Sequence, residues 1–278
     1  MKPRRNILVA FLLLAISSVG LVQAQKSSNA PAPRPFEPAE ELIYEAEFSR
    51  LLLRKVDVAD FKFTASRSQP SGEVKAPGGS EGNSKPSALM FTGDVTSKGF
   101  FSKLFNLRFR ERVESTVDPL SFTVQNTKRL DEQGKRVRNS EAVFDTTKGK
   151  VVWTEHDPTD PSRAPRVVSS EFQGNVQDVL SAIYFLRTQP LKVGKNLELL
   201  VSDSGQVYKV PIRVVERKRM KTVLGRVDTV RTEVELIGER RMINGEGQFS
   251  IWFTDESQRI PVSARIKNKI GTFDIKLK

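Results

Sequence analysis

The chain has 278 residues, with 45 Lys and Arg against 33 Asp and Glu, so its formal net charge is +12 at neutral pH. It contains no cysteine and a single histidine, His156. The missing cysteines exclude disulfides, thiol catalysis and a lipid-modified cysteine, and one histidine leaves too few of the usual ligands for a zinc site. We expect neither a metal nor a cofactor.

Residues 1–24 have the three zones of a cleavable signal peptide. A basic start precedes an almost entirely apolar stretch over residues 7–22, and Val22-Gln23-Ala24 then places small residues where a signal peptidase reads. The apolar stretch is shorter than the roughly 20 residues of a spanning helix, which disfavours an uncleaved anchor. We predict cleavage after Ala24, export to the periplasm or cell envelope of a bacterium, and no transmembrane span afterwards.

Two further segments are of low complexity. Residues 25–39 contain four prolines with Ser, Asn and Ala, which predicts a flexible Pro-rich tail. Residues 66–88 are almost free of apolar side chains and too long for an ordinary hairpin loop, which predicts a disordered insertion between two strands. We therefore expect a single β domain over residues 40–278.

Apolar and polar residues alternate with a period of two along most of this domain. That pattern is typical of antiparallel strands with one solvated face, and Gly-containing turn signals separate the runs. The apolar members of the runs are Leu42, Tyr44, Ala46 and Phe48; Phe105, Leu107 and Phe109; Tyr208, Val210, Ile212 and Val214; Val230, Val234 and Leu236; Phe249, Ile251 and Phe253; and Phe273, Ile275 and Leu277.

One segment has helical spacing instead. Apolar residues between Val176 and Leu186 recur every three or four positions, with Asn175 as the expected N-cap and Pro190 as the stop. A long antiparallel sheet accumulates twist and curls. The prediction is a mainly β fold, in which a curved antiparallel sheet closes to a half-barrel or barrel with one short helix packed on it.

The second half of the chain contains a recognisable set of residues: Asp178, Leu180, Ser181, Tyr184, Leu186, Arg187, Pro190-Leu191, Gly194, Tyr208, Gly225, Ile251-Trp252, Asp255, Arg259-Ile260-Pro261-Val262 and Gly271. In these residues it resembles the bacterial exported family catalogued as domain of unknown function 3108. Glu41–Phe48 is also similar to that family's first strand, whereas Ser49-Arg50-Leu51-Leu52 departs from its glycine-bearing first turn, and the insertion at 66–88 is absent from its pattern. The resemblance implies an envelope protein with a curved antiparallel sheet, and implies no activity.

Catalytic motifs are absent or lie in the wrong context. Gly78-Gly79-Ser80-Glu81-Gly82 has the letters of a hydrolase nucleophile elbow, but it lies in the low-complexity insertion, without a flanking strand and helix. His156 lies in an Asp/Pro-rich loop, and no phosphate-binding loop is present. We therefore expect a protein that is not an enzyme. Asp255 and Glu256 beside Trp252 keep one alternative open, a carboxylate-based hydrolase of envelope polysaccharide.

Two groups of residues are candidates for binding. Arg108, Arg110 and Arg112 share one strand face. Their side chains repel each other unless acidic side chains on neighbouring strands compensate the charge. Trp252 and Asp255 combine an aromatic ring with a carboxylate, although a packed or rim position for the ring and a turn cap for the carboxylate are the favoured explanation. The alternative for the arginines is a solvated strand face.

The leading hypothesis is an exported, non-catalytic envelope protein that binds a lipid, glycan or protein partner on a curved β surface. Export directs the positive charge toward anionic lipids or glycans rather than nucleic acid. A structural or assembly factor of the envelope, which pairs through an exposed strand edge, is the third hypothesis. The sequence leaves the oligomeric state open.

Overall fold

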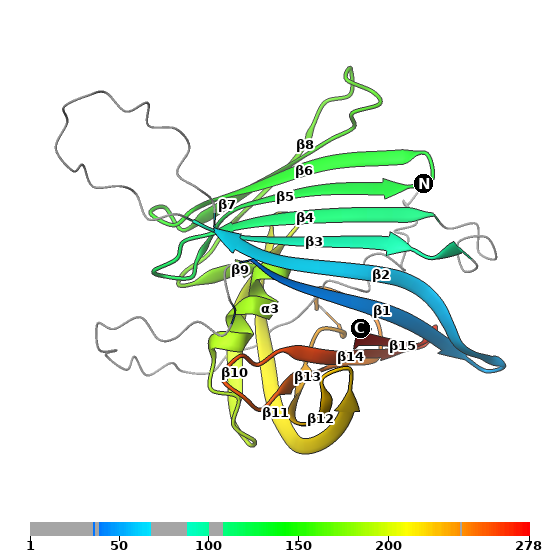
Figure 1. The fold of residues 1–278 in the computed structure, drawn as a ribbon. Helices are drawn as coiled ribbons and strands as arrows, with labels where there is room; N and C mark the ends of the chain where they lie inside the picture. Colours follow the sequence, from blue (N-terminus) through cyan, green and yellow to red (C-terminus); the bar gives the residue numbers. More distant parts are fainter. Residues whose placement is uncertain (1–35, 37–38, 68–87, 100–107, 240) are drawn as a thin grey trace, which may run out of the picture.

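The computed structural model describes residue 36 and residues 39–67, 88–99, 108–239 and 241–278. The predicted signal peptide at 1–24 and the part of a predicted strand that contains Phe105 and Leu107 lie outside these residues. The described residues form one 15-stranded sheet, antiparallel except for one pair, and a short helix (Figure 1). The mainly β prediction is confirmed. Within the described residues, no helix has the length and apolar character needed to cross a membrane.

The sheet consists of two consecutive meanders that meet at their ends. Its strand order runs from β8 back to β1 and then from β15 back to β9, so β1 and β15 lie at the middle. The first meander contains β1 (Glu40–Arg50), β2 (Leu53–Arg67), β3 (Leu89–Ser97), β4 (Phe109–Val117), β5 (Val124–Gln133), β6 (Arg136–Asp145), β7 (Lys150–His156) and β8 (Arg166–Glu171). The second contains β9 (Val176–Asp178), β10 (Asn196–Asp203), β11 (Gln206–Thr222), β12 (Gly225–Val234), β13 (Gly247–Thr254), β14 (Pro261–Asn268) and β15 (Gly271–Leu277).

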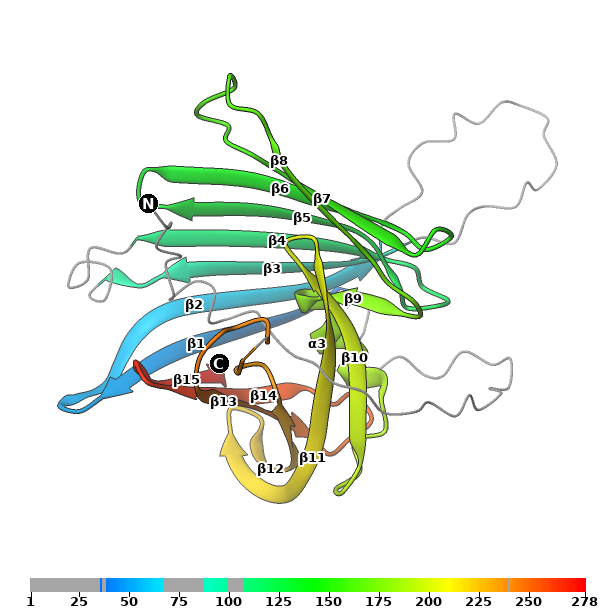
Figure 2. The ribbon, with the colours of Figure 1, turned by 180° about the vertical axis from the view of Figure 1, so that it is seen from behind.

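The two edge strands, β8 and β9, lie close together although they do not pair. The chain passes from Glu171 to Val176, and five residues span at most about 17 Å. The turn between β10 and β11 lies against β8, where the Ser170 hydroxyl donates a hydrogen bond to the Gly205 carbonyl at 2.7 Å. The sheet therefore curls almost into a barrel but stays open, as both figures of the ribbon show (Figures 1 and 2).

The inner face of the curled sheet holds the hydrophobic core. The predicted alternation is present in β1, where Leu42, Tyr44, Ala46 and Phe48 are buried. Two boundaries differ from the sequence prediction by a few residues. Phe36, in the predicted tail, is buried with its ring edge-on to other core rings. Residues 66–67, in the predicted insertion, belong to β2.

The helix α3 (Val179–Thr188) begins later than its spacing predicts. Residues 176–178 form β9, which pairs in parallel with β10, and Asp178 rather than Asn175 is the N-cap. The Asp178 carboxylate accepts a hydrogen bond from the Ser181 amide at 2.8 Å, and the Ser181 hydroxyl accepts one from the Asp178 amide at 3.0 Å. This reciprocal capping box satisfies two amides at the helix start. The helix ends before Pro190, as predicted.

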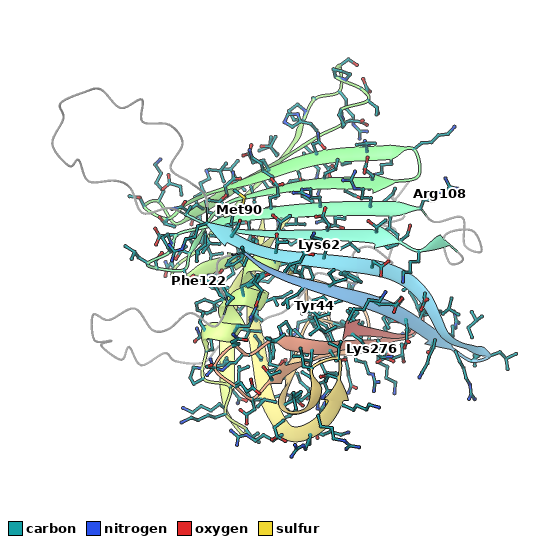
Figure 3. The ribbon with its side chains drawn as sticks, viewed as in Figure 1. Tyr44, Lys62, Met90, Arg108, Phe122 and Lys276 are labelled. Carbon is teal, nitrogen blue, oxygen red and sulfur yellow. The ribbon has the colours of Figure 1, made fainter. Side chains whose placement is uncertain are left out.

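Cross-strand ion pairs occupy much of the outer face of the sheet. Lys62 pairs with Glu41 at 2.8 Å, and Lys276 pairs with Glu47 across the seam between β1 and β15 (Figure 3). Opposite charges on neighbouring strands support the pairing of the sheet, although each exposed pair contributes little. The excess positive charge is therefore distributed among acidic partners over much of this face.

Candidate functional site

Acidic side chains surround the predicted arginine row. The Arg112 guanidinium lies 2.9 Å from Asp94 on β3 and 2.8 Å from Glu114 on its own strand. Arg110 lies 3.4 Å from Glu132 on β5. Arg108 directly precedes β4, so it lies at the same end of that strand as Arg110 (Figure 3). The repulsion expected within the row is thus relieved by neighbouring strands.

Trp252 and Asp255 lie on the other half of the sheet. The Trp252 ring on β13 has the guanidinium carbons of Arg231 and Arg265 each 6.0 Å from its centroid. The Asp255 carboxylate, in the turn after β13, lies 3.0 Å from Arg217. Strands β3, β2, β1, β15 and β14 separate β13 from β4. The structure does not bring the two groups together, and their role in binding stays a prediction.

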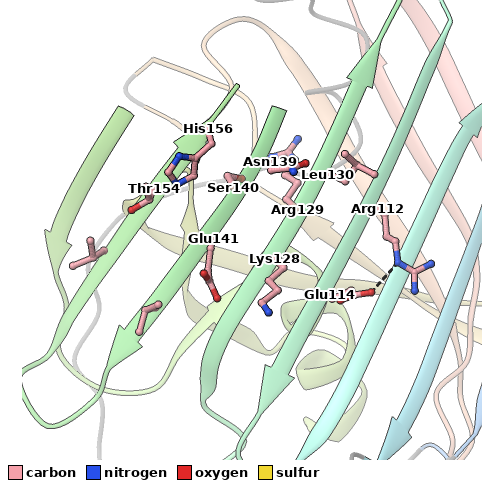
Figure 4. A pocket seen from close by; sticks show the side chains of 12 residues that line it. Arg112, Glu114, Lys128, Arg129, Leu130, Asn139, Ser140, Glu141, Thr154 and His156 are labelled. Carbon is pink, nitrogen blue, oxygen red and sulfur yellow. Dashed lines mark hydrogen bonds and ion pairs between the residues drawn. The ribbon is translucent and has the colours of Figure 1, made fainter. Parts of the chain in front are cut away.

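A groove of about 420 Å³ lies on the outer face of strands β4 to β7 (Figure 4). Its members come from four neighbouring strands and include charged, polar and aliphatic side chains. The lining residues are Arg112, Glu114, Lys128, Arg129, Leu130, Asn139, Ser140, Glu141, Val143, Val152, Thr154 and His156. We call this hollow the outer groove.

The outer groove offers one cation and one anion that are not paired with each other. Lys128 and Glu141 are direct neighbours across β5 and β6, yet neither makes an ion pair with the residues that the structure describes. The Glu141 carboxylate instead accepts a hydrogen bond from the Asn126 amide at 2.7 Å. Both charges are therefore available to a ligand in the groove.

Aliphatic side chains interrupt the polar surface of the groove. Val143 and Val152 face each other across β6 and β7, and both are exposed. Leu130 lies opposite Asn139, whose other neighbour is His156. An apolar surface beside available charges is the usual composition of a binding site.

A charged cluster occupies the inner face of the same strands. The Arg129 guanidinium lies 2.8 Å from Glu111 and 3.3 Å from Asp203, which joins β4 and β5 to the end of β10. Burial raises the pKa of Glu111, and this effect outweighs the opposing charge of Arg129. Burial lowers the pKa of Arg129, but the carboxylates of Glu111 and Asp203 raise it more strongly. Arg129 therefore stays charged and crosslinks the inner face.

The inner hollow beside this cluster is small. It measures about 40 Å³ and lies between β4 to β7 and the start of α3, where Thr127 donates a hydrogen bond to Asp178 at 2.5 Å. Such a volume holds a few water molecules at most. The part of the barrel interior that the structure describes at this position is filled by side chains. Two larger hollows lie nearby: the outer groove, and one of about 410 Å³ at the end of β3 to β5, which Arg108 and Arg110 line.

A second buried cluster joins the helix to both halves of the sheet. Arg187, in the last turn of α3, is 0% exposed and meets the Glu40 carboxylate in two contacts of 2.6 and 2.7 Å. Its Nε donates a hydrogen bond to the Gln258 carbonyl at 3.1 Å, and the Phe36 and Tyr184 rings lie within 5.5 Å of its guanidinium carbon. Burial raises the pKa of Tyr184. These contacts hold the fold and leave no room for a ligand.

Sequence reasoning missed the outer groove, although one signal was present. Ala142-Val143-Phe144 and Val151-Val152-Trp153 are apolar triplets, which break the alternation of a strand with one solvated face. The middle residue of each triplet must point outward, and these two valines line the groove. The sequence pattern predicts His156 as a loop residue, whereas it is the last residue of β7 and lines the groove.

The fold defines the class of the protein: a barrel-like β protein, whose antiparallel sheet curls around a filled interior and stays open. The chain belongs to the family described as "Protein of unknown function (DUF3108)", whose family model matches residues 68–278. The resemblance seen in the sequence is thereby confirmed.

The fold is similar to that of a solved structure. It is described as a beta-barrel-like protein of domain of unknown function DUF1849 from Brucella abortus, and the two share a TM-score of 0.51 and 8% sequence identity. The alignment covers 86% of this chain and 94% of that chain. At this identity the likeness concerns the fold alone. No curated protein matches the sequence.

Proposed function

We propose that the chain is an exported, non-catalytic binding protein of the cell envelope, which holds a peptide segment of a protein partner in the outer groove. The observation that supports this most directly is the contrast between two hollows over the same strands. The outer groove measures about 420 Å³, within the usual size of ligand sites, whereas the inner hollow measures about 40 Å³.

The chemistry of the groove favours a peptide over a lipid or a glycan. Lys128 and Glu141 supply charges of both signs, which suit a peptide with acidic and basic side chains. Val143 and Val152 supply an apolar surface for an aliphatic side chain. No Phe, Tyr or Trp is among the residues that line the groove, so the ring stacking common in sugar sites has no counterpart there.

The positions of the acidic residues favour binding over hydrolysis. A carboxylate-based hydrolase needs two carboxyl groups on either side of a substrate. Asp255 pairs with Arg217, and Glu111 and Asp203 share Arg129 beside a hollow that is too small for a sugar ring. These carboxylates make structural ion pairs. The outer groove itself contains two carboxylates, but Glu114 is paired with Arg112, and only Glu141 is without an ion pair among the residues described.

The experiment is amide chemical-shift mapping of isotope-labelled protein with three probes. They are a tryptic digest of envelope proteins, soluble fragments of cell-wall polysaccharide, and micelles of envelope lipid. We expect the peptide digest to change the amide chemical shifts of residues in β5 to β7. Val152→Glu should reduce the affinity for the peptides at least ten-fold. Val223→Glu, at an exposed valine in the turn between β11 and β12, should leave it unchanged.

The proposal has two contrary outcomes. Shifts in β5 to β7 with the polysaccharide fragments alone would replace the peptide by a glycan. Peptide binding that Val152→Glu and Val223→Glu weaken equally would place the site outside the outer groove.

A further inference from the structure

The hairpin of β1 and β2 ends in three exposed leucines. Arg50 pairs with Leu53, so Leu51 and Leu52 form a two-residue loop, and their side chains are 88% and 98% exposed. Leu53 is also exposed. The tip projects beyond the neighbouring strands in both views of the ribbon (Figures 1 and 2). We call residues 50–55 the leucine tip.

The leucine tip has an unfavourable turn chemistry. Leu51 has φ 49°, in the left-handed region that two-residue hairpin loops usually fill with Gly, Asn or Asp. Lys55 also has a positive φ of 53°, beside an irregularity in the pairing of β1 with β2. Burial inside this protein offers no compensation, because the leucines are exposed. Backbone strain of this kind is concentrated at functional sites.

Three cations flank the leucines. Arg50, Arg54 and Lys55 make no ion pair with the residues that the structure describes, unlike Lys62 and Lys276 further along the outer face. The first acidic residues back from the tip are Glu47 and Asp57, which are neighbours across the two strands, and Glu47 pairs with Lys276. The end of the hairpin is therefore apolar at its outermost residues and positively charged at the residues next to them.

We propose that the leucine tip inserts into the surface of an anionic lipid membrane. The leucines would enter the boundary between headgroups and acyl chains, where apolar side chains leave water. The guanidinium and ammonium groups behind them would lie at the depth of the lipid phosphates, and each adds about five-fold to membrane binding. This inference is independent of the outer groove, which lies on strands β4 to β7.

The test uses a fluorescent probe at the tip, Leu52→Trp. Vesicles of phosphatidylglycerol mixed with phosphatidylcholine should shift the added emission to shorter wavelength, and brominated lipids should quench it. The matched control is Leu120→Trp, at a 79% exposed leucine in the turn between β4 and β5, where Asp118 supplies negative charge. Its added emission should stay unchanged. Because the signal is local to each probe, membrane contact elsewhere in the chain does not imitate it.

A second variant tests the charges. Replacing Arg50, Arg54 and Lys55 by Gln in the Leu52→Trp chain should weaken vesicle binding about a hundred-fold, and about 1 M salt should weaken binding of the parent chain. Equal shifts with vesicles of phosphatidylcholine alone would overturn the role of the cations. An emission spectrum of the Leu52→Trp chain that no vesicle changes would overturn the proposal. A blue shift that grows with protein concentration in the absence of vesicles would replace the membrane by a second copy of the chain.

Discussion

Arg187 is a charged side chain without solvent contact, and the Glu40 carboxylate is one of the groups that compensate its charge. Glu40 meets the guanidinium in two contacts, at the start of the strand that also forms the middle of the sheet. A buried ion pair of this kind is weak evidence for net stability, but removal of the Glu40 charge takes away a close counter-charge from the buried guanidinium.

Glu40→Gln should therefore lower the free energy of unfolding by about 3 kcal/mol, measured by urea denaturation. Glu41→Gln is the matched control, because the neighbouring Glu41 pairs with Lys62 and both side chains are about half exposed. Its effect should stay below about 1 kcal/mol. Equal losses in the two variants would contradict a special role for the buried pair.

Individual residue roles were only partly predictable from the sequence. The row of Arg110 and Arg112 followed from the period of two, but its acidic partners Asp94 and Glu132 come from two neighbouring strands. Register between strands sets these contacts, and alternation within a strand says nothing about register. The outer groove was missed for the same reason, since it needs four strands side by side.

The helix shows how a local motif overrides periodicity. Val176 and Val179 continue the helical spacing, yet β9 takes residues 176–178 because they pair in parallel with β10. The helix then begins after Asp178. The Asp178 carboxylate accepts one hydrogen bond from the Ser181 amide and another from the Thr127 hydroxyl. Apolar spacing predicted the helix and its end, but the start depends on a strand partner that is distant in sequence.

Asp178→Ala should lower the free energy of unfolding by about 2 kcal/mol, because it removes the cap and the buried acceptor of Thr127. Asn175→Ala, at the cap that helical spacing predicts, should cost less than about 1 kcal/mol, because that side chain reaches only an exposed Ser121 carbonyl and Gln177. Urea denaturation measures both. A larger loss for Asn175→Ala would contradict the observed helix start.

The near closure of the whole sheet depends on a close approach at Gly205. A Cβ at this position would lie 2.7 Å from the Val168 carbonyl oxygen and 2.9 Å from the Trp153 Cβ. No side chain fits between the β10–β11 turn and the terminal strands β7 and β8. From the sequence this glycine is predicted only as a turn residue. The curvature of the sheet brings it against β8, where its contact Ser170 lies 35 residues earlier in the chain.

Gly205→Ala should lower the free energy of unfolding by about 2 kcal/mol more than Gly134→Ala does, because both need a positive φ but only Gly205 is crowded. Gly134 has φ 62°, and a methyl group added there would have nothing within 4 Å. Hydrogen exchange of β8 amides should also be faster in Gly205→Ala. Equal effects of the two substitutions on stability and exchange would show that the closure does not need this contact.

The position of β1 beside β15 has a consequence for the order of assembly. Each meander pairs strands that follow one another closely in sequence, so either can begin to form from its own part of the chain. The seam joins Tyr44 to Leu277, so it forms only after all the other strands have been synthesised. Until β15 pairs, β1 and β14 each present an unpaired edge, which is the part of a sheet most prone to wrong association. The seven-residue β15 thus joins two half-sheets into one sheet and covers two edges that would otherwise be exposed.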